Sequence, residues 1–470
     1  MKWRNLKNLT VCGGGVTGMV NAILLAQIGH KVSLVETSDA LGGLFKSVKV
    51  DDWSFDQGLY IPQLTGIDCI DQIFLKSCEI NIRSESEKDI AGNVFKQIHN
   101  ENSQFIDARL LPKETTAKIV MEMIERISQE SGGINQAQDM ESYFKSHFGT
   151  EAVNFIYDAI SQRFWRKDLK SLSSIALKVV HMPRLVMFNQ EVSRTLKDSH
   201  KYFDDRVAYP DQLKIPQNFI EGKTSSIYPK RFGLFHLVDG LTRMINDLDI
   251  EVRMNTRIES IKTSGSKIVN VGINQAGNKE VIRTDGVLWC GATEALHRIL
   301  GFKAEPLLDK SIPHRTHYVI CNTKPKAGRV YWSWDFDENN VIRISFPHNY
   351  SCISDKDKKY LVMVEAHDDP KMSESEFKVW LVKYLEGIGL TSRRDITHIY
   401  SPESSKRQFF VPSLRNIKRD SNMVSDIGNR DLVNLYFCSA KISDGIFYLH
   451  DLLKDSHERI SDLLEMNTWN

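Results

Sequence analysis

Short apolar runs separated by turn residues open the chain. Residues 9–12 form an apolar run typical of a buried strand, and a glycine-rich turn follows it. Apolar side chains then recur at helical spacing as far as Gly29, and a second apolar run covers residues 31–36. A strand, a glycine turn, a helix and a second strand within about 30 residues predict a βαβ unit.

The rest of the chain alternates between helical and strand-like patterns. Residues 114–199 are mostly helical in pattern, and residues 199–224 are polar and interrupted by proline, which predicts a loop. Strands are predicted at 251–261, 267–273, 281–290, 329–334, 341–346, 360–365 and 432–438, and helices at 233–248, 373–386 and 450–466. This mixture predicts an α/β protein with more than one structural part.

Composition narrows the class of protein. The 470 residues are 41% hydrophobic and 26% charged, which is ordinary for a globular chain and excludes a disordered or coiled-coil protein. The 61 basic and 60 acidic side chains leave a net charge of +1, so no basic surface for nucleic acid and no polybasic membrane anchor is expected. No apolar run is long enough to span a bilayer, which indicates a cytoplasmic protein without a transmembrane segment.

Cysteine and histidine give no sign of a metal site. The seven cysteines form no CxxC pair, so neither a zinc site nor a disulfide framework is predicted, and a reducing compartment is the simpler interpretation. The 14 histidines show no HxH or HExxH spacing. Cys290 and Cys438 end apolar strands and are expected to be inert core thiols.

The first βαβ unit carries a dinucleotide-binding pattern. Gly13, Gly15 and Gly18 follow the GxGxxG spacing, in which the glycines allow a tight turn, a close backbone approach to a pyrophosphate and close helix packing. The phosphates would lie at the helix N-terminus, near Val16 and Thr17. Glu36, which ends the second strand, would accept hydrogen bonds from a ribose. The alternative is a glycine turn that binds no ligand.

The residues after Glu36 distinguish FAD from NAD. Five residues separate Glu36 from the pair Gly42-Gly43. This spacing resembles flavoproteins related to the amine oxidases, phytoene desaturases, protoporphyrinogen oxidases and UDP-galactopyranose mutases. The resemblance implies FAD, with Gly42, Gly43 and Leu44 near its pyrophosphate and ribityl chain. Alternatively, the glycine pair is only a flexible turn.

Further motifs extend this resemblance along the chain. Residues 55–60 resemble an F-(D/E)-x-G-x-H stretch that passes close to the flavin, which implies that Gly58 and Leu59 contact the cofactor, and Tyr60 stands where histidine is usual. Residues 227–241 are similar to a YP…GG(L/M) segment, with Asp239 in place of a glycine. Residues 255–258 resemble a strand whose backbone meets the adenine, which implies a cofactor contact at Ile258.

Two other segments resemble the sugar-associated members of these flavoproteins. Arg343, Ser345, Asn349, Ser351 and Glu365 match an R-(V/I)-S…N-x-S…E pattern of the UDP-galactopyranose mutase-like and protoporphyrinogen oxidase-like branch. The C-terminal segment is similar to the mutase-like G-R-x-G-x-F-x-Y-x-x-x-D pattern, aligned on Phe447 and Tyr448. The usual Gly-Arg then falls on Ala440 and Lys441, where a lysine can still meet a phosphate as a point charge.

Three residues are candidates for the substrate side of the flavin. Tyr60 and Tyr448 could orient a hydroxyl or pack on the ring, and Arg343 could hold a carboxylate or phosphate with two hydrogen bonds. The alternative for each tyrosine is a core aromatic side chain, and the alternative for Arg343 is a surface ion pair. Three further pairs are weaker candidates. His236 and Asp239 are of types that are more often helix caps, and Trp332 and Trp334 share a strand face. The third pair is Lys406-Arg407.

Together these features predict a two-lobed α/β flavoprotein. Its discontinuous Rossmann-type FAD-binding lobe would comprise residues 1–80, 225–300 and 401–470, and an α+β substrate lobe of antiparallel sheet and helices would comprise residues 81–224 and 301–400. The expected function is FAD-dependent oxidation of a small polar substrate by hydride transfer to the flavin. The resemblance suggests a nucleotide- or lipid-linked sugar of the kind used in polysaccharide biosynthesis. There are two alternatives: a redox-neutral nucleotide-sugar mutase, and a non-catalytic binding protein with the same fold. A homo-oligomer is compatible with either.

Overall fold

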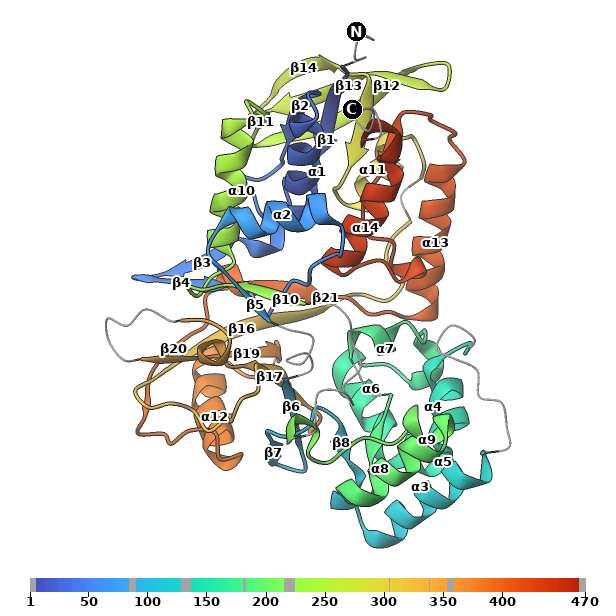
Figure 1. The fold of residues 1–470 in the computed structure, drawn as a ribbon, viewed down its shortest axis with the longest axis vertical. Coiled ribbons are helices and arrows are strands. Elements are labelled where there is room, and N and C mark those ends of the chain that lie inside the picture. Colours follow the sequence, from blue (N-terminus) through green and yellow to red (C-terminus); the bar gives the residue numbers. More distant parts are fainter. Residues whose placement is uncertain are drawn as a thin grey trace. The chain divides into compact units, whose positions relative to one another are not determined.

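The computed structural model describes residues 6–83, 90–127, 137–180, 183–214, 225–303, 305–337, 339–352, 359–369 and 371–464 (Figure 1). Residues 215–224 of the loop predicted at 199–224 and the last two residues of the predicted C-terminal helix lie outside them, and the described part of that loop contains a short helix at Lys201–Asp204. The chain forms two compact units. The first comprises Met1–Ser84, Thr224–Leu307 and Lys418–Asn470, and the second comprises Glu85–Lys223 and Leu308–Ile417.

The first unit is built on a five-stranded parallel sheet with the order β11-β2-β1-β15-β22. These strands are β1 (Asn8–Cys12), β2 (Lys31–Val35), β11 (Glu251–Arg253), β15 (Gly286–Trp289) and β22 (Leu435–Phe437). The central strands are apolar along nearly their whole length because layers cover both faces of the sheet. The predicted βαβ unit is present, with α1 (Val16–Gln27) between β1 and β2.

Helices and a second sheet form the two covering layers. Helix α1 packs against both α10 (Phe235–Asp247) and α14 (Leu449–Arg459), which the blue, green and red ribbons of Figure 1 show side by side. The opposite face buries Cys12, Trp289 and Phe437 against the antiparallel sheet β12-β13-β14. That sheet consists of β12 (Thr256–Ser264), β13 (Lys267–Gln275) and β14 (Asn278–Arg283).

The single strand predicted at 281–290 is wrong, because the chain changes sheets within it. Strand β14 ends at Arg283 in the antiparallel sheet, and β15 begins at Gly286 in the parallel sheet. Thr284 and Asp285 make the turn, and the Asp285 carboxylate accepts a hydrogen bond from the backbone N–H of Asn8 at 2.8 Å. A change from exposed to buried positions marks the switch, since β14 is mostly exposed and β15 is buried throughout.

Smaller elements complete the first unit. They are the hairpin of β3 (Ser47–Val50) and β4 (Trp53–Asp56), the pair of β5 (Ile80–Arg83) and β10 (Ser226–Pro229), and the helices α2 (Asp68–Ser77), α11 (Thr293–Ile299) and α15 (Ser461–Leu464). Helix α13 (Leu414–Gly428) begins in the second unit and ends in the first.

The second unit contains an eight-stranded sheet, in which β20-β16-β19-β18-β17-β6-β7 are neighbours and β21 also pairs with β16. Its strands are β6 (Ala91–Phe95), β7 (Ile98–Asn100), β16 (Ile312–Cys321), β17 (Trp332–Asp335), β18 (Val341–Ser345), β19 (Tyr360–His367), β20 (Ile396–Tyr400) and β21 (Lys406–Phe409). Because β21 pairs with β16, residues 401–417 belong to the second unit and not to the FAD-binding part to which the sequence analysis assigned them.

Helices make up the rest of the second unit. They are α3 (Lys113–Glu125), α4 (Met140–Phe148), α5 (Thr150–Ala152), α6 (Asp158–Trp165), α7 (Ala176–Val179), α8 (Gln190–Ser199), α9 (Lys201–Asp204) and α12 (Glu374–Gly387), and the short parallel pair of β8 (Ile106–Asp107) and β9 (Leu185–Val186) lies among them. A π-helical turn at Val153–Tyr157 joins α5 to α6.

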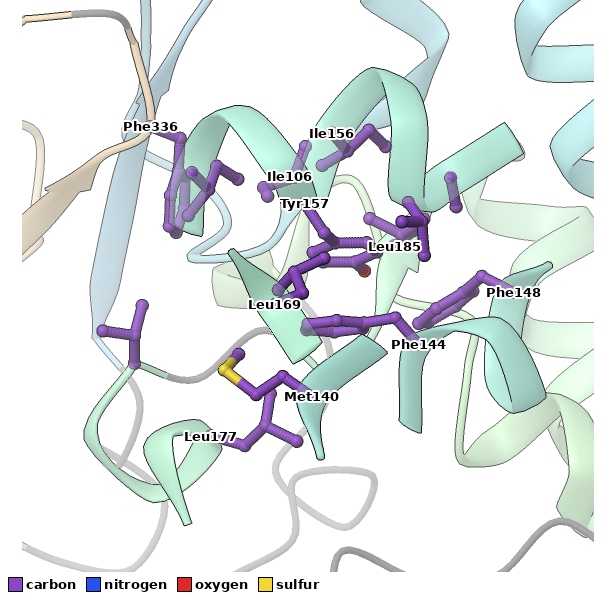
Figure 2. Close-up of a cluster of buried hydrophobic side chains, with 14 of the residues drawn as sticks. Ile106, Met140, Phe144, Phe148, Ile156, Tyr157, Leu169, Leu177, Leu185 and Phe336 are labelled. Carbon is purple, nitrogen blue, oxygen red and sulfur yellow. The ribbon is translucent and has the colours of Figure 1, made fainter. Parts of the chain in front are cut away.

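Aromatic side chains fill the helical core, as Figure 2 shows. The rings of Phe144 and Tyr157 are stacked with their centroids 3.5 Å apart, and Phe148 lies 5.8 Å from Tyr157. The hydrophobic cluster continues to Trp334 and Phe336 of the sheet. One apolar core therefore joins the helices of the second unit to its sheet.

No helix among the described residues is long and apolar enough to cross a membrane. Within the same residues, no group of three or more His, Cys, Asp or Glu side chains is arranged to hold a metal ion.

Buried imidazoles make the second unit sensitive to acid. Burial lowers the pKa values of His99, His147 and His348 to about 4 and those of His317 and His367 to about 3. In the unfolded chain each would titrate near ~6.5, so the unfolded state binds more protons than the folded state as the pH falls below that value. Burial also raises the pKa of Asp335 to about 6. This shift stabilises the folded state as the pH falls, but it comes from one group, whereas the five imidazoles act in the opposite direction.

We therefore expect the free energy of unfolding to fall steeply between pH 7.5 and pH 5. A matched variant is His99→Gln, because the His99 ring contacts the Ser333 hydroxyl at 2.8 Å and a glutamine amide can keep that contact. Removing one such imidazole should reduce the loss at pH 5 by about 2 kcal/mol. Urea unfolding at both pH values tests this, and equal pH dependence in wild type and variant would contradict it.

Candidate functional site

The three glycines of the first turn have three different packing environments. Gly13 has a φ of +109°, and a Cβ built there would lie 3.0 Å from the backbone of Cys290. A Cβ at Gly18 would lie 1.9 Å from the Gly13 carbonyl oxygen, so a side chain there would push α1 away from β1. A Cβ at Gly15 would meet no atom within 4 Å. Gly13 and Gly18 are therefore required by packing, whereas Gly15 leaves room for a ligand.

The N-terminus of α1 opens beside that room. Gly15 is the N-cap residue, and no side chain caps the helix. The first N–H groups, including those of Val16 and Thr17, thus have no side-chain acceptor at the cap. Together with the helix dipole, these donors favour a bound phosphate.

Glu36 follows the carboxyl end of β2, next to the same turn. One carboxylate oxygen accepts a hydrogen bond from the Gly14 N–H at 2.6 Å, and the other accepts from the N–H and hydroxyl of Ser38 at 2.7 and 2.6 Å. Burial alone would raise the pKa of Glu36, but these hydrogen bonds and the nearby Lys46 outweigh it and lower the pKa. Glu36 is therefore an ionised acceptor held at the turn, as a ribose contact requires.

The second glycine pair packs on the first turn. The Gly42 N–H donates to the Gly14 carbonyl oxygen at 2.8 Å, and Gly15 and Gly42 form an isolated parallel bridge. Both Gly42 and Gly43 have positive φ, and a Cβ at Gly43 would lie 3.2 Å from the Gly15 Cα. The pair is therefore held against the first turn and is not a loose turn, and its contact with the cofactor stays a prediction. The adjacent Leu44 side chain is 55% exposed.

Two of the resembling motifs contact each other through Asp56, which the sequence analysis did not single out. Asp56 is buried; its carboxylate accepts hydrogen bonds from the Tyr228 hydroxyl and, at 2.7 Å, from the Leu234 N–H where α10 begins. The Gly233 N–H also donates to the Tyr228 hydroxyl at 3.2 Å. The F-D-x-G and Y-P…G segments thus form one hydrogen-bonded unit. The only sign of this contact in the sequence is an acidic residue in one motif and a tyrosine in the other.

Lys441 makes a contact that the sequence did not indicate. Its side chain is almost fully buried, and its ammonium group pairs with Asp455 of α14, which also pairs with Arg459 at 2.9 Å. Burial lowers the pKa of Lys441, and the hydrogen bond to Asp455 opposes this effect. The ammonium group therefore anchors α14 to the end of β22. A phosphate contact by Lys441 stays a prediction.

The other predicted residues of the first unit lie at two places. Gly58, Leu59 and Ile258 are buried, and Tyr60 is half-buried with its ring 5.8 Å from that of Phe45. At the C-terminal segment, the Ala440 carbonyl accepts from the Thr293 hydroxyl at 3.2 Å. Tyr448 is the N-cap residue of α14 and is 37% exposed, with its ring 4.7 Å from that of Phe447.

The second unit supplies a polar and aromatic sheet face. Arg343 of β18 is in register with Glu365 of β19 and with Trp334 of β17, so all three share one face. The Arg343 guanidinium donates to both Glu365 carboxylate oxygens at 2.8 and 2.9 Å and lies 5.2 Å from the Trp334 ring centroid. Helix α12 packs on the opposite face, where the Phe377 ring stacks on that of His317 at 4.3 Å.

Several buried polar atoms on the Arg343 face lack a hydrogen-bond partner among the described residues, and two of them belong to the paired strands β17 and β18. These two atoms are the indole Nε1 of Trp332 and the hydroxyl of Ser345, which are cross-strand neighbours. Leaving such groups unsatisfied is costly, so a face that holds them suits a ligand with hydrogen-bonding groups. Trp332 and Trp334 share this face, as their alternation predicts.

The weaker candidates occupy unremarkable positions. Asp239 is exposed on α10, and the half-buried His236 ring packs 4.2 Å from that of Phe235. Lys406 forms an ion pair with Glu403 at 2.8 Å. Arg407 is in register with His314 across β21 and β16.

Comparison with known proteins agrees with this geometry. Residues 11–66 match the family model of the NAD(P)-binding Rossmann-like domain. A 4,4'-diaponeurosporene oxygenase of Staphylococcus aureus (strain MRSA252) is 22% identical over 93% of this chain and 94% of its own length.

Solved structures share the fold over nearly the whole chain. A reduced UDP-galactopyranose mutase has a TM-score of 0.70 at 13% identity, covering 98% of this chain and 96% of its own. A putative protoporphyrinogen oxidase from Exiguobacterium sp. 255-15 has a TM-score of 0.62 at 15% identity, covering 98% and 99%. A putrescine oxidase has a TM-score of 0.58 at 13% identity with the same coverage.

The chain has a flavoprotein-oxidase fold. The resemblance inferred from the sequence is confirmed at this level. The predicted cofactor FAD is supported as well, because the matched Rossmann-like domain is the FAD-binding fold.

The glycine environments predict opposite outcomes for two substitutions. Gly15→Ala should leave the fold intact, because its Cβ meets open space and the φ of −68° suits alanine, but it should weaken FAD binding by filling the phosphate site. Gly18→Ala should lower the free energy of unfolding by about 1–3 kcal/mol, the usual cost of overpacking. Thermal unfolding of the cofactor-stripped protein and FAD titration measure the two effects separately. Equal effects of both substitutions on stability would contradict this assignment.

Proposed function

We propose that the protein is an FAD-dependent oxidoreductase that acts on a small polar substrate. The observation that carries the proposal is the cradle of the first turn, where the open position at Gly15 faces the uncapped N-terminus of α1 and lies beside the ionised Glu36. Its donors suit a pyrophosphate, and its acceptor suits a ribose.

Bound FAD would supply a hydride acceptor, and the chain's own residues would hold and orient the reactants. The N–H groups of Val16 and Thr17 would donate hydrogen bonds to the pyrophosphate. The Glu36 carboxylate would accept hydrogen bonds from the ribose, either in addition to the one from the Gly14 N–H or instead of it. Gly42 and Gly43 would allow the backbone to approach without a Cβ.

On the substrate side, the proposal assigns roles to Tyr60, Tyr448 and Arg343. The two tyrosines would orient a substrate hydroxyl, and the Arg343–Glu365 pair would offer a donor and an acceptor at fixed positions. Because Glu365 neutralises Arg343, a neutral polyhydroxyl group suits this pair better than a free anion. A sugar-type substrate meets this requirement and also offers partners to Trp332 and Ser345.

The first experiment measures flavin in the purified protein. Absorption maxima near ~375 and ~450 nm, with FAD released by heat in a ratio near one per chain, are expected of a flavoprotein. A colourless protein that takes up no added FAD would contradict the proposal and favour the non-catalytic alternative.

A second experiment separates oxidation from isomerisation. Turnover of sugars and nucleotide sugars is measured with and without an electron acceptor. An oxidoreductase consumes the acceptor in stoichiometric amounts, whereas a mutase needs only prior reduction with dithionite. Acceptor-independent isomerisation would overturn the oxidoreductase assignment and favour the mutase.

Substitution of the ion pair tests the substrate side. Arg343→Lys cannot keep both hydrogen bonds to Glu365, so we expect kcat/KM to fall roughly 10- to 100-fold, since hydrogen bonds to charged groups contribute about 1.5–3 kcal/mol. The FAD content should not change. Arg253→Lys is a matched control, because Arg253 also bridges two carboxylates, Glu251 and Glu280, but lies on β11 of the parallel sheet. An equal loss in both variants would contradict a role of Arg343 toward substrate.

A further inference from the structure

Three cysteines lie at the carboxyl ends of neighbouring parallel strands in the first unit. Cys12 ends β1, Cys290 directly follows β15, and Cys438 directly follows β22. Cys12 is in register with Trp289, and both pack against the antiparallel sheet. Since side chains alternate along a strand, Cys290 and Cys438 face the opposite layer, which contains α1 and α14.

Cys290 and Cys438 occupy neighbouring positions of adjacent strands on that face. Trp289 and Phe437 are in register, and the Cys438 N–H continues the ladder by donating to the Trp289 carbonyl at 2.9 Å. Neighbouring strands lie about 4.8 Å apart, a Cα separation within the range of about 4.4–6.8 Å at which disulfides form.

The surroundings give the two thiols different roles. The Asn21 side-chain amide of α1 points its Nδ2 at the Cys290 sulfur from 3.8 Å, and the Ser456 hydroxyl of α14 holds the amide oxygen at 3.3 Å. Cys290 is half-buried, whereas Cys438 is buried. The contact with Cys290, followed by burial, raises the pKa of Cys438. Cys438 therefore keeps its proton, and Cys290 is the more accessible of the two sulfurs.

We propose that Cys290 and Cys438 form a reversible redox pair that a peroxide oxidises to a disulfide. The Cys290 sulfur attacks one oxygen of hydrogen peroxide, the O–O bond breaks, and the thiol proton of Cys290 joins the departing hydroxide as water, which leaves a sulfenic acid on Cys290. The Cys438 sulfur then attacks the Cys290 sulfur, its proton leaves with the hydroxyl group as water, and the S–S bond closes. Two thiols are oxidised, one peroxide is reduced, and two waters result.

Because Cys290 and Cys438 lie on adjacent parallel strands, we expect the disulfide between them to be reduced readily. Each cysteine is held by the backbone ladder, so the disulfide must adapt to the strand spacing and is expected to be strained. Strained disulfides are reduced more easily than structural ones. Within the part of the chain that the structure describes, Cys69 has no such arrangement with a second cysteine. It is exposed, and its sulfur has the His457 ring as its neighbour at 3.7 Å.

The test uses the reduced full-length protein and does not depend on flavin or turnover. Protein is treated with hydrogen peroxide, remaining thiols are blocked with N-ethylmaleimide after unfolding, and peptides are identified by mass spectrometry. We expect two of the seven thiols to be lost, in one peptide pair that links Cys290 to Cys438, and to return with dithiothreitol. A link through Cys12, or no link at all, would overturn the proposal.

Single substitutions assign the order of events. Cys438→Ser should trap the sulfenic acid on Cys290, where dimedone labels it, and Cys290→Ser should leave Cys438 unlabelled. Cys69→Ser is the control and should form the disulfide as wild type does. Circular dichroism confirms that each variant folds. Dimedone labelling of Cys438 in Cys290→Ser, equal to that of Cys290 in Cys438→Ser, would show that the assigned order is wrong.

Discussion

The contact between Gly18 and the Gly13 carbonyl is the constraint on which the first unit depends. With only a hydrogen atom at Gly18, the first helix can lie directly on the end of the first strand. That close approach aims the helix N-terminus at the open side of Gly15 and places the turn against Glu36 and Gly42. The cradle is thus a result of backbone packing, and few side chains are needed to build it.

Within each of the two units, the charged candidate residues are paired with other groups of the same unit. Arg343 is matched by Glu365, Lys441 by Asp455, and the Glu36 carboxylate already accepts four hydrogen bonds. Such pairs hold their side chains in fixed geometry and lower the net charge presented to a ligand. The donors that remain at the phosphate position are backbone N–H groups of α1, which cannot rearrange when a ligand arrives.

The local features of the site could be predicted from the sequence, whereas its long-range contacts could not. The glycine spacing, the helix after it and Glu36 are encoded within one short segment, so the packing roles of Gly13 and Gly18 could be predicted from the sequence, and the pyrophosphate contact at Gly15 stays a prediction. The Asp56–Tyr228 hydrogen bond joins residues 172 positions apart, and the salt bridge of Lys441 depends on how α14 docks on β22. The strand at 281–290 was misjudged because an apolar pattern does not show which sheet a strand joins.

The order of strands in the parallel sheet has a consequence for biosynthesis. Strand β1 pairs with β15, which pairs with β22, and the Ser456 hydroxyl binds Asn21 across 435 residues of chain. Such distant partners make loop closure slow and costly in entropy. During translation, β1 can pair with β2 at once, but its other edge stays open until β15 has emerged at residues 286–289. An unpaired apolar strand edge is the kind of surface that aggregates or is bound by chaperones while a chain is still being made.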